Sequence, residues 1–176
     1  MTDDASVWSY RLTAPDRKDP ACVGDERTML ADYLDYYRAT FEAKCRGLAS
    51  DQLDVRSVPP SSLSLHGLVR HLAGCERWWF RQQFAGLDLP DLYEGDDDFD
   101  ALDGDANEAL ALWRAECAAS RAIVDAAPSL DATGTRRSTG EPISLRWVML
   151  RMITEYARHD GHADLLRELI DGATGE

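Results

Sequence analysis

The sequence predicts an all-α protein, a four-helix bundle, and three observations support this prediction. The chain has 176 residues, a length that suits one domain with a full hydrophobic core. Four long segments carry apolar side chains at steps of three and four residues, which is the spacing of a helix with one buried face. No segment shows a convincing strand pattern. We therefore expect one bundle domain over residues 25–172, preceded by an irregular arm at 1–24 and followed by a tail at 173–176.

Two helices are expected in the first half of the chain, over about residues 25–48 and 62–85. Ser62 or Ser64 can cap the second of them through its hydroxyl group, and Gly86 is placed to stop it. The apolar positions that form the two buried stripes are Leu30, Leu34, Tyr37, Phe41, Cys45 and Leu48 in the first helix, and Leu65, Leu68, Leu72, Cys75 and Trp79 in the second.

A long acidic connection, residues 87–104, separates the second helix from the third. Its length is unusual for a turn between adjacent helices, so it is either a crossover between non-adjacent helices or a flap. The acidic run is most simply a solvated surface, because it lacks the full EF-hand pattern of a calcium loop. The third helix is expected over about residues 105–127, and the fourth between Ser144 and Gly172, after a turn-rich segment at 129–142.

The histidines of the chain cluster in two of the predicted helices. Glu155, His159 and His162 lie in the middle of the fourth helix, where residues four apart differ by only about 40° around the axis and residues seven apart by about 20°. Their side chains can therefore converge on one point. His66 and His71 lie in the second helix, but they are about 140° apart around the axis, so the two cannot easily serve one site.

A metal site is one interpretation of this cluster. His159 falls in the apolar stripe of the last helix, and Glu155 lies in the adjacent column, where a carboxylate is costly unless it is paired or binds a metal. A Glu and a His four apart, with a His from a facing helix, supply three ligands that suit catalytic zinc and leave a fourth position open. The other interpretation is structural: Arg151 and Arg158 could hold Glu155 in a salt bridge, and His71 could be an ordinary boundary residue.

Composition limits the classes of binding partner and indicates the cellular compartment. The net charge of −13 and the pI of about 4.6 disfavour binding to nucleic acid. The four cysteines show no spacing typical of a disulfide framework, which indicates reduced thiols in a cytoplasmic protein. Cys75 could line a cavity with His71, one turn away, but is more simply a small core residue. No secretory signal and no apolar stretch of membrane-spanning length is present, so we expect a soluble protein.

Two motif blocks resemble the DinB superfamily: GLVRHLAGCERWWF at residues 67–80 and EYARHDGHADLLRELIDG at residues 155–172. Within that superfamily, the chain is similar to the DinB-like branch related to mycothiol-dependent metalloenzymes such as maleylpyruvate isomerase and thiol S-transferases. The resemblance covers about residues 25–172. It implies an up-down-down-up bundle, in which the long connection after the second helix is a crossover.

The resemblance also implies a ligand set for a divalent metal, namely His71, Glu155 and His159. Many DinB-like proteins have histidine in place of Glu155, and the glutamate version resembles the mycothiol-dependent maleylpyruvate isomerase type. His162 stands where many relatives carry glutamine. Its implied role is to orient a ligand or the metal-bound water, with direct ligation as the less favoured alternative. Zinc is the metal we expect, although nickel and iron accept the same ligands.

Three functions are compatible with these residues. The first, which we favour, is a metal-dependent S-transferase of detoxification or stress response. Its metal would hold a low-molecular-weight thiol such as mycothiol as a thiolate for attack on a small electrophile. The second is a metal-dependent hydrolase or isomerase that uses metal-bound water. The third is a non-catalytic metal-binding stress or interaction protein.

Surface and pocket residues are less well defined by the sequence. Exposed apolar positions on the first and last helices could support a homodimer. Aromatic side chains could line a substrate pocket, although aromatic residues at helical spacing are more often core, and two arginines could meet an anionic group there. These candidates are Trp78, Trp113, Trp147, Tyr156, Arg151 and Arg158.

Overall fold

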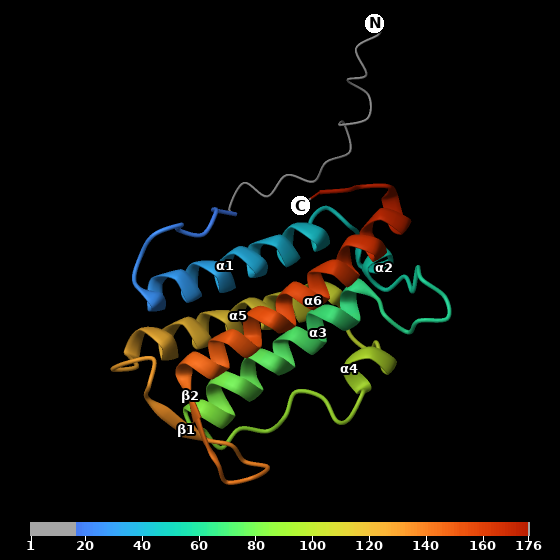
Figure 1. The fold of residues 1–176 in the computed structure, drawn as a ribbon. Coiled ribbons are helices and arrows are strands. Elements are labelled where there is room, and N and C mark those ends of the chain that lie inside the picture. Colours follow the sequence, from blue (N-terminus) through green and yellow to red (C-terminus); the bar gives the residue numbers. More distant parts are fainter. Residues whose placement is uncertain (1–16, 176) are drawn as a thin grey trace, which may run out of the picture.

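The computed structural model describes residues 17–175 and consists of helices with one small hairpin (Figure 1). Its four long helices are α1 (Glu26–Cys45), α3 (Leu65–Glu76), α5 (Ala106–Ala126) and α6 (Leu145–Asp171). The π-helical segment η1 (Arg77–Phe84) continues α3 directly. Shorter elements lie in the connections: α2 (Ser50–Leu53), α4 (Asp97–Asp100), β1 (Thr133–Thr135) and β2 (Pro142–Ser144). The predicted four-helix bundle is confirmed, while residues 1–16 of the predicted arm lie outside the described part of the chain.

The helices follow the up-down-down-up order. α1 and α6 run in one direction, and α3 and α5 run together in the opposite direction (Figure 1). α1 packs mainly on α6, α3 packs mainly on α5, and α3 also contacts α6. Because α3 and α5 are parallel, the chain between them must return along the whole bundle, which explains the length of residues 87–104.

Side-chain caps explain where the helices begin and end. Ser64 Oγ accepts a hydrogen bond from the backbone N–H of Gly67 at 3.0 Å, so Ser64 rather than Ser62 caps α3. Ser144 caps α6 in the same way, and Gly172 ends that helix with a φ of 76°. Each predicted helix end lies within three residues of the observed one.

The hairpin differs from the sequence prediction, which contained no strand. Its strands have only three residues each, too few to show an alternating pattern. Gly134 of β1 pairs with Ile143 of β2, which is buried. A Cβ atom at Gly134 would lie 2.3 Å from the carbonyl oxygen of Phe84, so only glycine lets β1 approach the end of η1 this closely.

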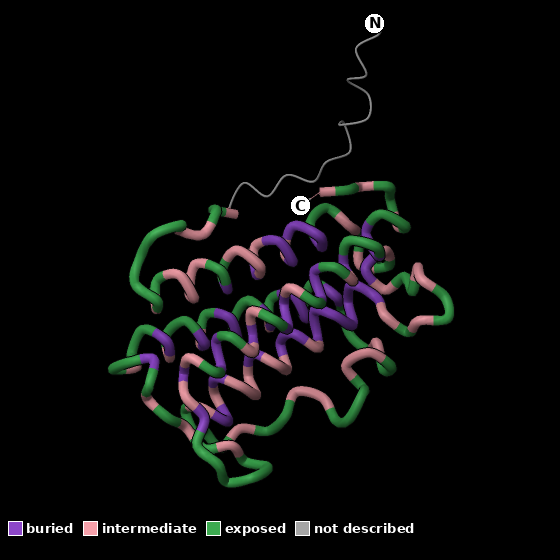
Figure 2. The backbone as a smooth tube through the Cα atoms, in the orientation of Figure 1, coloured by how far each residue is buried: buried purple, intermediate pink, exposed green. Residues whose placement is uncertain are grey.

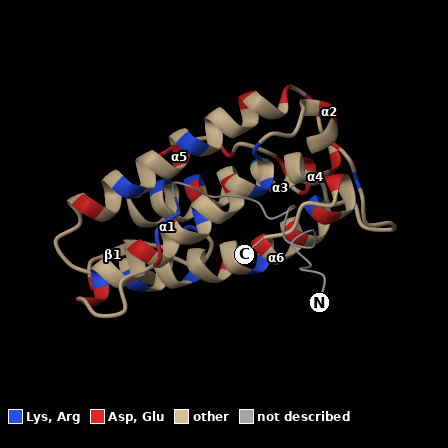
Figure 3. Cartoon of the chain, turned by 90° about the horizontal axis from the view of Figure 1, so that it is seen from above, with Lys and Arg blue, Asp and Glu red and all other residues tan. Residues whose placement is uncertain are grey.

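Most charged residues lie outside the buried stripes of the bundle, although several charged side chains are buried between the helices. Buried residues form stripes on the helix faces that turn toward one another (Figure 2). Charged residues cover the outside, and several aspartates lie around α4 (Figure 3). Over residues 17–175, no helix is long and apolar enough to cross a membrane.

One carboxylate inside the bundle contacts all three of the other long helices. Glu76, the last residue of α3, is fully buried and accepts two hydrogen bonds of 2.8 Å from the guanidinium of Arg38 on α1. The hydroxyl of Tyr156 on α6 donates to Glu76 at 2.8 Å, and on α5 Cys117 contacts the same oxygen while Trp113 donates to Tyr156. Burial alone would raise the pKa of Glu76, but Arg38 and the hydrogen bonds outweigh it and lower this pKa.

A second buried carboxylate has no such partners. Asp160 on α6 is only 5% exposed, and neither of its oxygens has a hydrogen-bond partner among the described residues. Burial, and then the negative charge of Asp164, raise the pKa of Asp160 to about 8. Lys44 and Arg17 are the cations near Asp160, and Lys44 lies 2.5 Å from Asp164 instead. Asp160 is therefore largely protonated in the folded protein at neutral pH.

Arg38→Met is expected to destabilise the protein by about 3–5 kcal/mol, because it leaves the Glu76 carboxylate buried without its cation. Urea unfolding followed by circular dichroism measures this loss. The matched control is Arg121→Met, which removes an exposed ion pair with Asp35 and should cost less than about 1 kcal/mol. Equal losses in the two variants would contradict the special role of Arg38.

Asp160→Asn is expected to stabilise the metal-free protein, and more strongly as the pH rises. The stability linked to the raised pKa of Asp160 is complete below its ordinary value of 3.8 and is lost as the pH rises through about 8, whereas asparagine does not titrate. The gain in unfolding free energy should grow between these limits to at least about 2 kcal/mol and then level off. Urea titrations at several pH values measure it, with the exposed Glu168→Gln as control. A gain that does not change with pH would exclude this explanation.

Candidate metal centre

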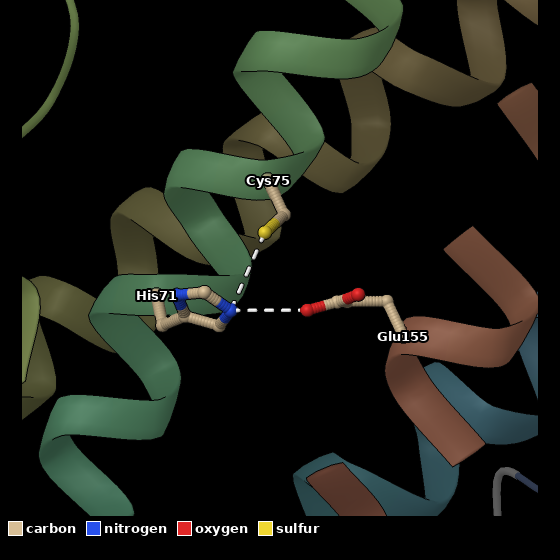
Figure 4. Close-up of side chains that lie close together, drawn as sticks. All are labelled: His71, Cys75 and Glu155. Atoms are coloured by element: carbon tan, nitrogen blue, oxygen red, sulfur yellow. Dashed lines mark hydrogen bonds and ion pairs between the residues drawn. The ribbon is translucent and has the colours of Figure 1, made fainter. Parts of the chain in front are cut away.

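Two pairs of side chains face each other across the interface between α3 and α6. His71 and Cys75 lie one turn apart on α3, and Glu155 and His159 lie one turn apart on α6. Figure 4 shows His71, Cys75 and Glu155 pointing toward one another from the two helices. Glu155 Oε1 lies 3.2 Å from Nε2 of His71 and 3.2 Å from Nε2 of His159. The structure thus brings the three predicted residues together and places Cys75 beside them.

A further residue, Asp98, reaches this cluster from α4. Its Oδ2 lies 2.8 Å from Nδ1 of His71, and the ring of Phe99 stacks on the imidazole with ring centres 4.8 Å apart. A carboxylate that accepts the Nδ1 proton fixes the ring orientation, so that Nε2 faces Glu155. The acidic connection is therefore more than a solvated surface, which corrects the simplest interpretation of its sequence: residues 97–100 cover one side of the cluster.

Strong charge interactions hold the cluster together. Hydrogen bonds from His159 and His71 keep the pKa of Glu155 well below its usual range, although burial opposes this shift. Burial disfavours the charged form of His71, but hydrogen bonds with Asp98, Cys75 and Glu155 outweigh burial and raise the pKa of His71 to about 11. Without a metal, His71 is therefore an imidazolium held between two carboxylates.

The separations between donor atoms fit a divalent cation. Two nitrogen or oxygen ligands at about 2.0–2.1 Å from a tetrahedral zinc lie about 3.3–3.4 Å apart, and a nitrogen and a thiolate sulfur lie about 3.6 Å apart. The distance from Glu155 Oε1 to each imidazole nitrogen is 3.2 Å, and Cys75 Sγ lies 3.5 Å from Nε2 of His71. The ligand atoms of His71, Cys75 and Glu155 all lie within 4.8 Å of one another, and His159 adjoins this set through its contact with Glu155 Oε1 without being a member of it.

His162 and Arg151 border the cluster. Nδ1 of His162 lies 3.3 Å from Nδ1 of His159, the ring nitrogen that does not face Glu155, a place that suits an orienting role. Arg151 lies 2.8 Å from Glu155 Oε2 as an ion pair, without the alignment of a hydrogen bond. The salt bridge considered from the sequence is therefore present, but it uses the carboxylate oxygen that faces neither histidine. His66 lies apart and binds a different carboxylate.

A cavity of about 280 Å³ opens beside the cluster. Of the aromatic residues considered for a pocket, Trp78 lines this cavity. Trp113 and Tyr156 instead belong to the buried hydrogen bonds around Glu76. Trp147 is exposed and packs on Trp79. The lining includes His71, Cys75 and Asp98 together with Trp78, Gln82 and Tyr93.

A larger cavity, about 510 Å³, lies elsewhere, between α1 and α5. Its walls mix acidic and basic side chains, and no residue of the histidine cluster lines it. We place the candidate site at the smaller cavity, because histidine, cysteine and carboxylate groups converge beside it with separations that suit a metal ion.

The fold and the site define a DinB-like four-helix bundle with candidate metal ligands on α3 and α6. A conserved protein from Enterococcus faecalis shares the fold, with a TM-score of 0.62 and 17% identity, over 85% of this chain and 99% of that one. YfiT from Bacillus subtilis, described as a probable metal-dependent hydrolase with an unusual four-helix bundle topology, has a TM-score of 0.61 and 15% identity, over 85% and 91%. The profile of the mycothiol-S-transferase family matches residues 29–172, and the chain belongs to this family. No curated protein matches this chain.

Sequence reasoning missed Asp98 and favoured a core role for Cys75, which in the structure packs against the core and also lies beside the cluster. The one local signal for Asp98 is Phe99, an aromatic residue inside an acidic run, which a purely solvated loop does not need. Cys75 has a clearer signal, because it follows His71 by the same four residues that separate Glu155 from His159. A matched spacing on two facing helices indicates a shared site.

Asp98→Asn is expected to lower the zinc affinity of the protein by about 10–100-fold, because the amide holds the Nδ1 proton of His71 less strongly and makes its Nε2 a weaker donor. Competition with a chromophoric chelator measures the affinity. The neighbouring Asp97→Asn is the matched control, since the Asp97 side chain is exposed and should leave the affinity unchanged. If the two variants bind zinc equally well, Asp98 serves only the packing of α4.

Proposed function

We propose that the protein is a metal-dependent S-transferase that joins a low-molecular-weight thiol of the mycothiol type to a small electrophile. His71, Glu155 and His159 would hold a divalent metal, with zinc as the first choice. One observation carries the proposal: a single carboxylate oxygen of Glu155 lies 3.2 Å from an imidazole nitrogen on each of two facing helices. Membership of the mycothiol-S-transferase family supports a thiol as one of the two substrates.

The chemistry needs a thiolate at neutral pH. When bound, the metal would supply Lewis acidity, which lowers the pKa of a coordinated thiol. In the transfer, a bond forms between the sulfur and the electrophilic carbon, the leaving group departs with the bonding electrons, and the thiol proton passes to solvent. The residues named here would act as ligands and orienting groups, and no side chain is assigned as the acid or base.

The surrounding residues prepare the site for this task. Asp98 accepts the Nδ1 proton of His71, and so it leaves the lone pair of Nε2 for a metal ion. Trp78 gives the adjacent cavity an apolar wall, which suits an organic electrophile. Arg151 is partly exposed beside Glu155 and offers a positive charge to an anionic group of either substrate.

Zinc-loaded protein is expected to consume a low-molecular-weight thiol and monochlorobimane together, faster than the reaction without protein. Glu155→Gln should reduce the rate by more than about 100-fold, because even the partners of metal ligands account for 10–100-fold. Fluorescence of the bimane adduct measures the rate, and Glu168→Gln, at an exposed position of α6, is the control.

The contrary outcomes identify the alternatives. Turnover of esters or amides without any thiol would favour a metal-dependent hydrolase, which would use the same ligands. Zinc binding without turnover across several thiols and electrophiles would favour a non-catalytic metal-binding protein. The homodimer, the stress-response role and the cytoplasmic location stay predictions. Exposed leucines on α6, among them Leu165 and Leu169, would offer an apolar surface to such a dimer.

A further inference from the structure

We propose that Cys75 is a fourth ligand of the metal, one that the incoming thiol must displace. The metal would then be held by two matched pairs, His71 with Cys75 on α3 and Glu155 with His159 on α6. This inference rests on the proposed metal site, but it assigns a role to a residue that the proposed function does not use.

The position of Cys75 supports ligation. Its Sγ lies 3.5 Å from Nε2 of His71, close to the separation of about 3.6 Å between a sulfur and a nitrogen on one tetrahedral zinc. The same sulfur and Glu155 belong to a set of ligand atoms within 4.8 Å of one another (Figure 4). Cys75 follows His71 by one helical turn, so both side chains point from the same face of α3.

The environment of Cys75 differs from that of a core cysteine. Cys45 and Cys117 are buried, and burial raises the pKa of Cys45 to about 12, so its thiol stays protonated. Cys75 is only half-buried and lines the 280 Å³ cavity beside the cluster. Cys22 is exposed and far along the chain in the N-terminal segment. Cys75 therefore combines a ligand position with access from the cavity, which a small core residue does not need.

Ligation by Cys75 would change how a thiol enters the site. Three ligands leave a fourth tetrahedral position open, whereas Cys75 would close it. An incoming thiol would then have to take the place of Cys75 as the sulfur ligand, and Cys75 would take up the proton that this thiol gives up. The charge of the centre stays the same in this exchange. The cavity lies on the Cys75 side of the cluster, so a thiol that enters through it meets Cys75 directly.

Zinc X-ray absorption of the full-length protein tests this assignment. The protein should be reduced with a phosphine, so that no added thiol competes for the metal. Wild-type protein is expected to show one sulfur neighbour at about 2.3 Å beside nitrogen and oxygen neighbours at about 2.0–2.2 Å. Cys75→Ser should lose the sulfur neighbour and keep the zinc, and Cys22→Ser, the control, should keep both.

Each contrary result is decisive. Zinc with only nitrogen and oxygen neighbours in wild type, or a sulfur neighbour that persists in Cys75→Ser, would overturn the role of Cys75 and leave the three-ligand site intact. Failure of wild-type protein to bind zinc, cobalt or nickel would instead overturn the metal site, and with it both this inference and the proposed function.

Discussion

The buried carboxylate of Glu76 on α3 contacts side chains from the other three long helices, and its need for these partners constrains how the bundle packs. An ionised carboxylate without partners in such a place would cost several kcal/mol, so α1 must present Arg38 and α6 must present Tyr156 at this level of the bundle. Glu76 directly follows Cys75, and Tyr156 directly follows Glu155. Adjacent residues on a helix point about 100° apart, so α3 and α6 turn one residue toward the buried network and its neighbour toward the candidate metal site. The network therefore lies directly beside the candidate ligands and constrains how α3 and α6 face each other there.

Two carboxyl groups on α6 show that neighbouring side chains determine whether a buried acid is ionised. Glu155 lies between two imidazoles with an arginine at its other oxygen, and these partners keep its pKa well below the usual range. Asp160 lies five residues further along the same helix, without a hydrogen-bond partner among the described residues, and burial raises its pKa to about 8. The side chains around Glu155 thus stabilise its ionised form, which is the form that a metal ligand needs. The surroundings of Asp160 instead favour the neutral acid.

Helical periodicity was sufficient to predict the bundle, because each apolar stripe is long and Ser64, Ser144 and Gly172 mark helix ends. The hairpin could not be predicted, because three-residue strands show no pattern and the close approach of Gly134 to Phe84 is a tertiary contact. The pair Glu155 and His159 was visible because its spacing is local. Its meeting with His71 is long-range, and the resemblance to DinB-like proteins supplied that expectation.

The positions of Asp98 and Cys75 at the site could not be predicted from the sequence, for physical reasons. Asp98 reaches His71 only because the crossover folds back over α3, a path that its acidic composition does not reveal. Cys75 was ambiguous, because burial in a core and ligation of a metal require the same position on the inner face of a helix. The structure places Cys75 Sγ 3.5 Å from Nε2 of His71 and on the wall of the 280 Å³ cavity, a position that depends on how α3, α4 and α6 pack together.

The most direct test of the central claim is the metal content of tag-free protein after reconstitution, measured by inductively coupled plasma mass spectrometry. Wild type should hold about one zinc ion per chain, and His71→Ala and Glu155→Ala should lose it while circular dichroism shows that both remain folded. Wild-type protein that stays empty after reconstitution with zinc, nickel and iron would contradict the account and reduce His71, Glu155 and His159 to structural residues.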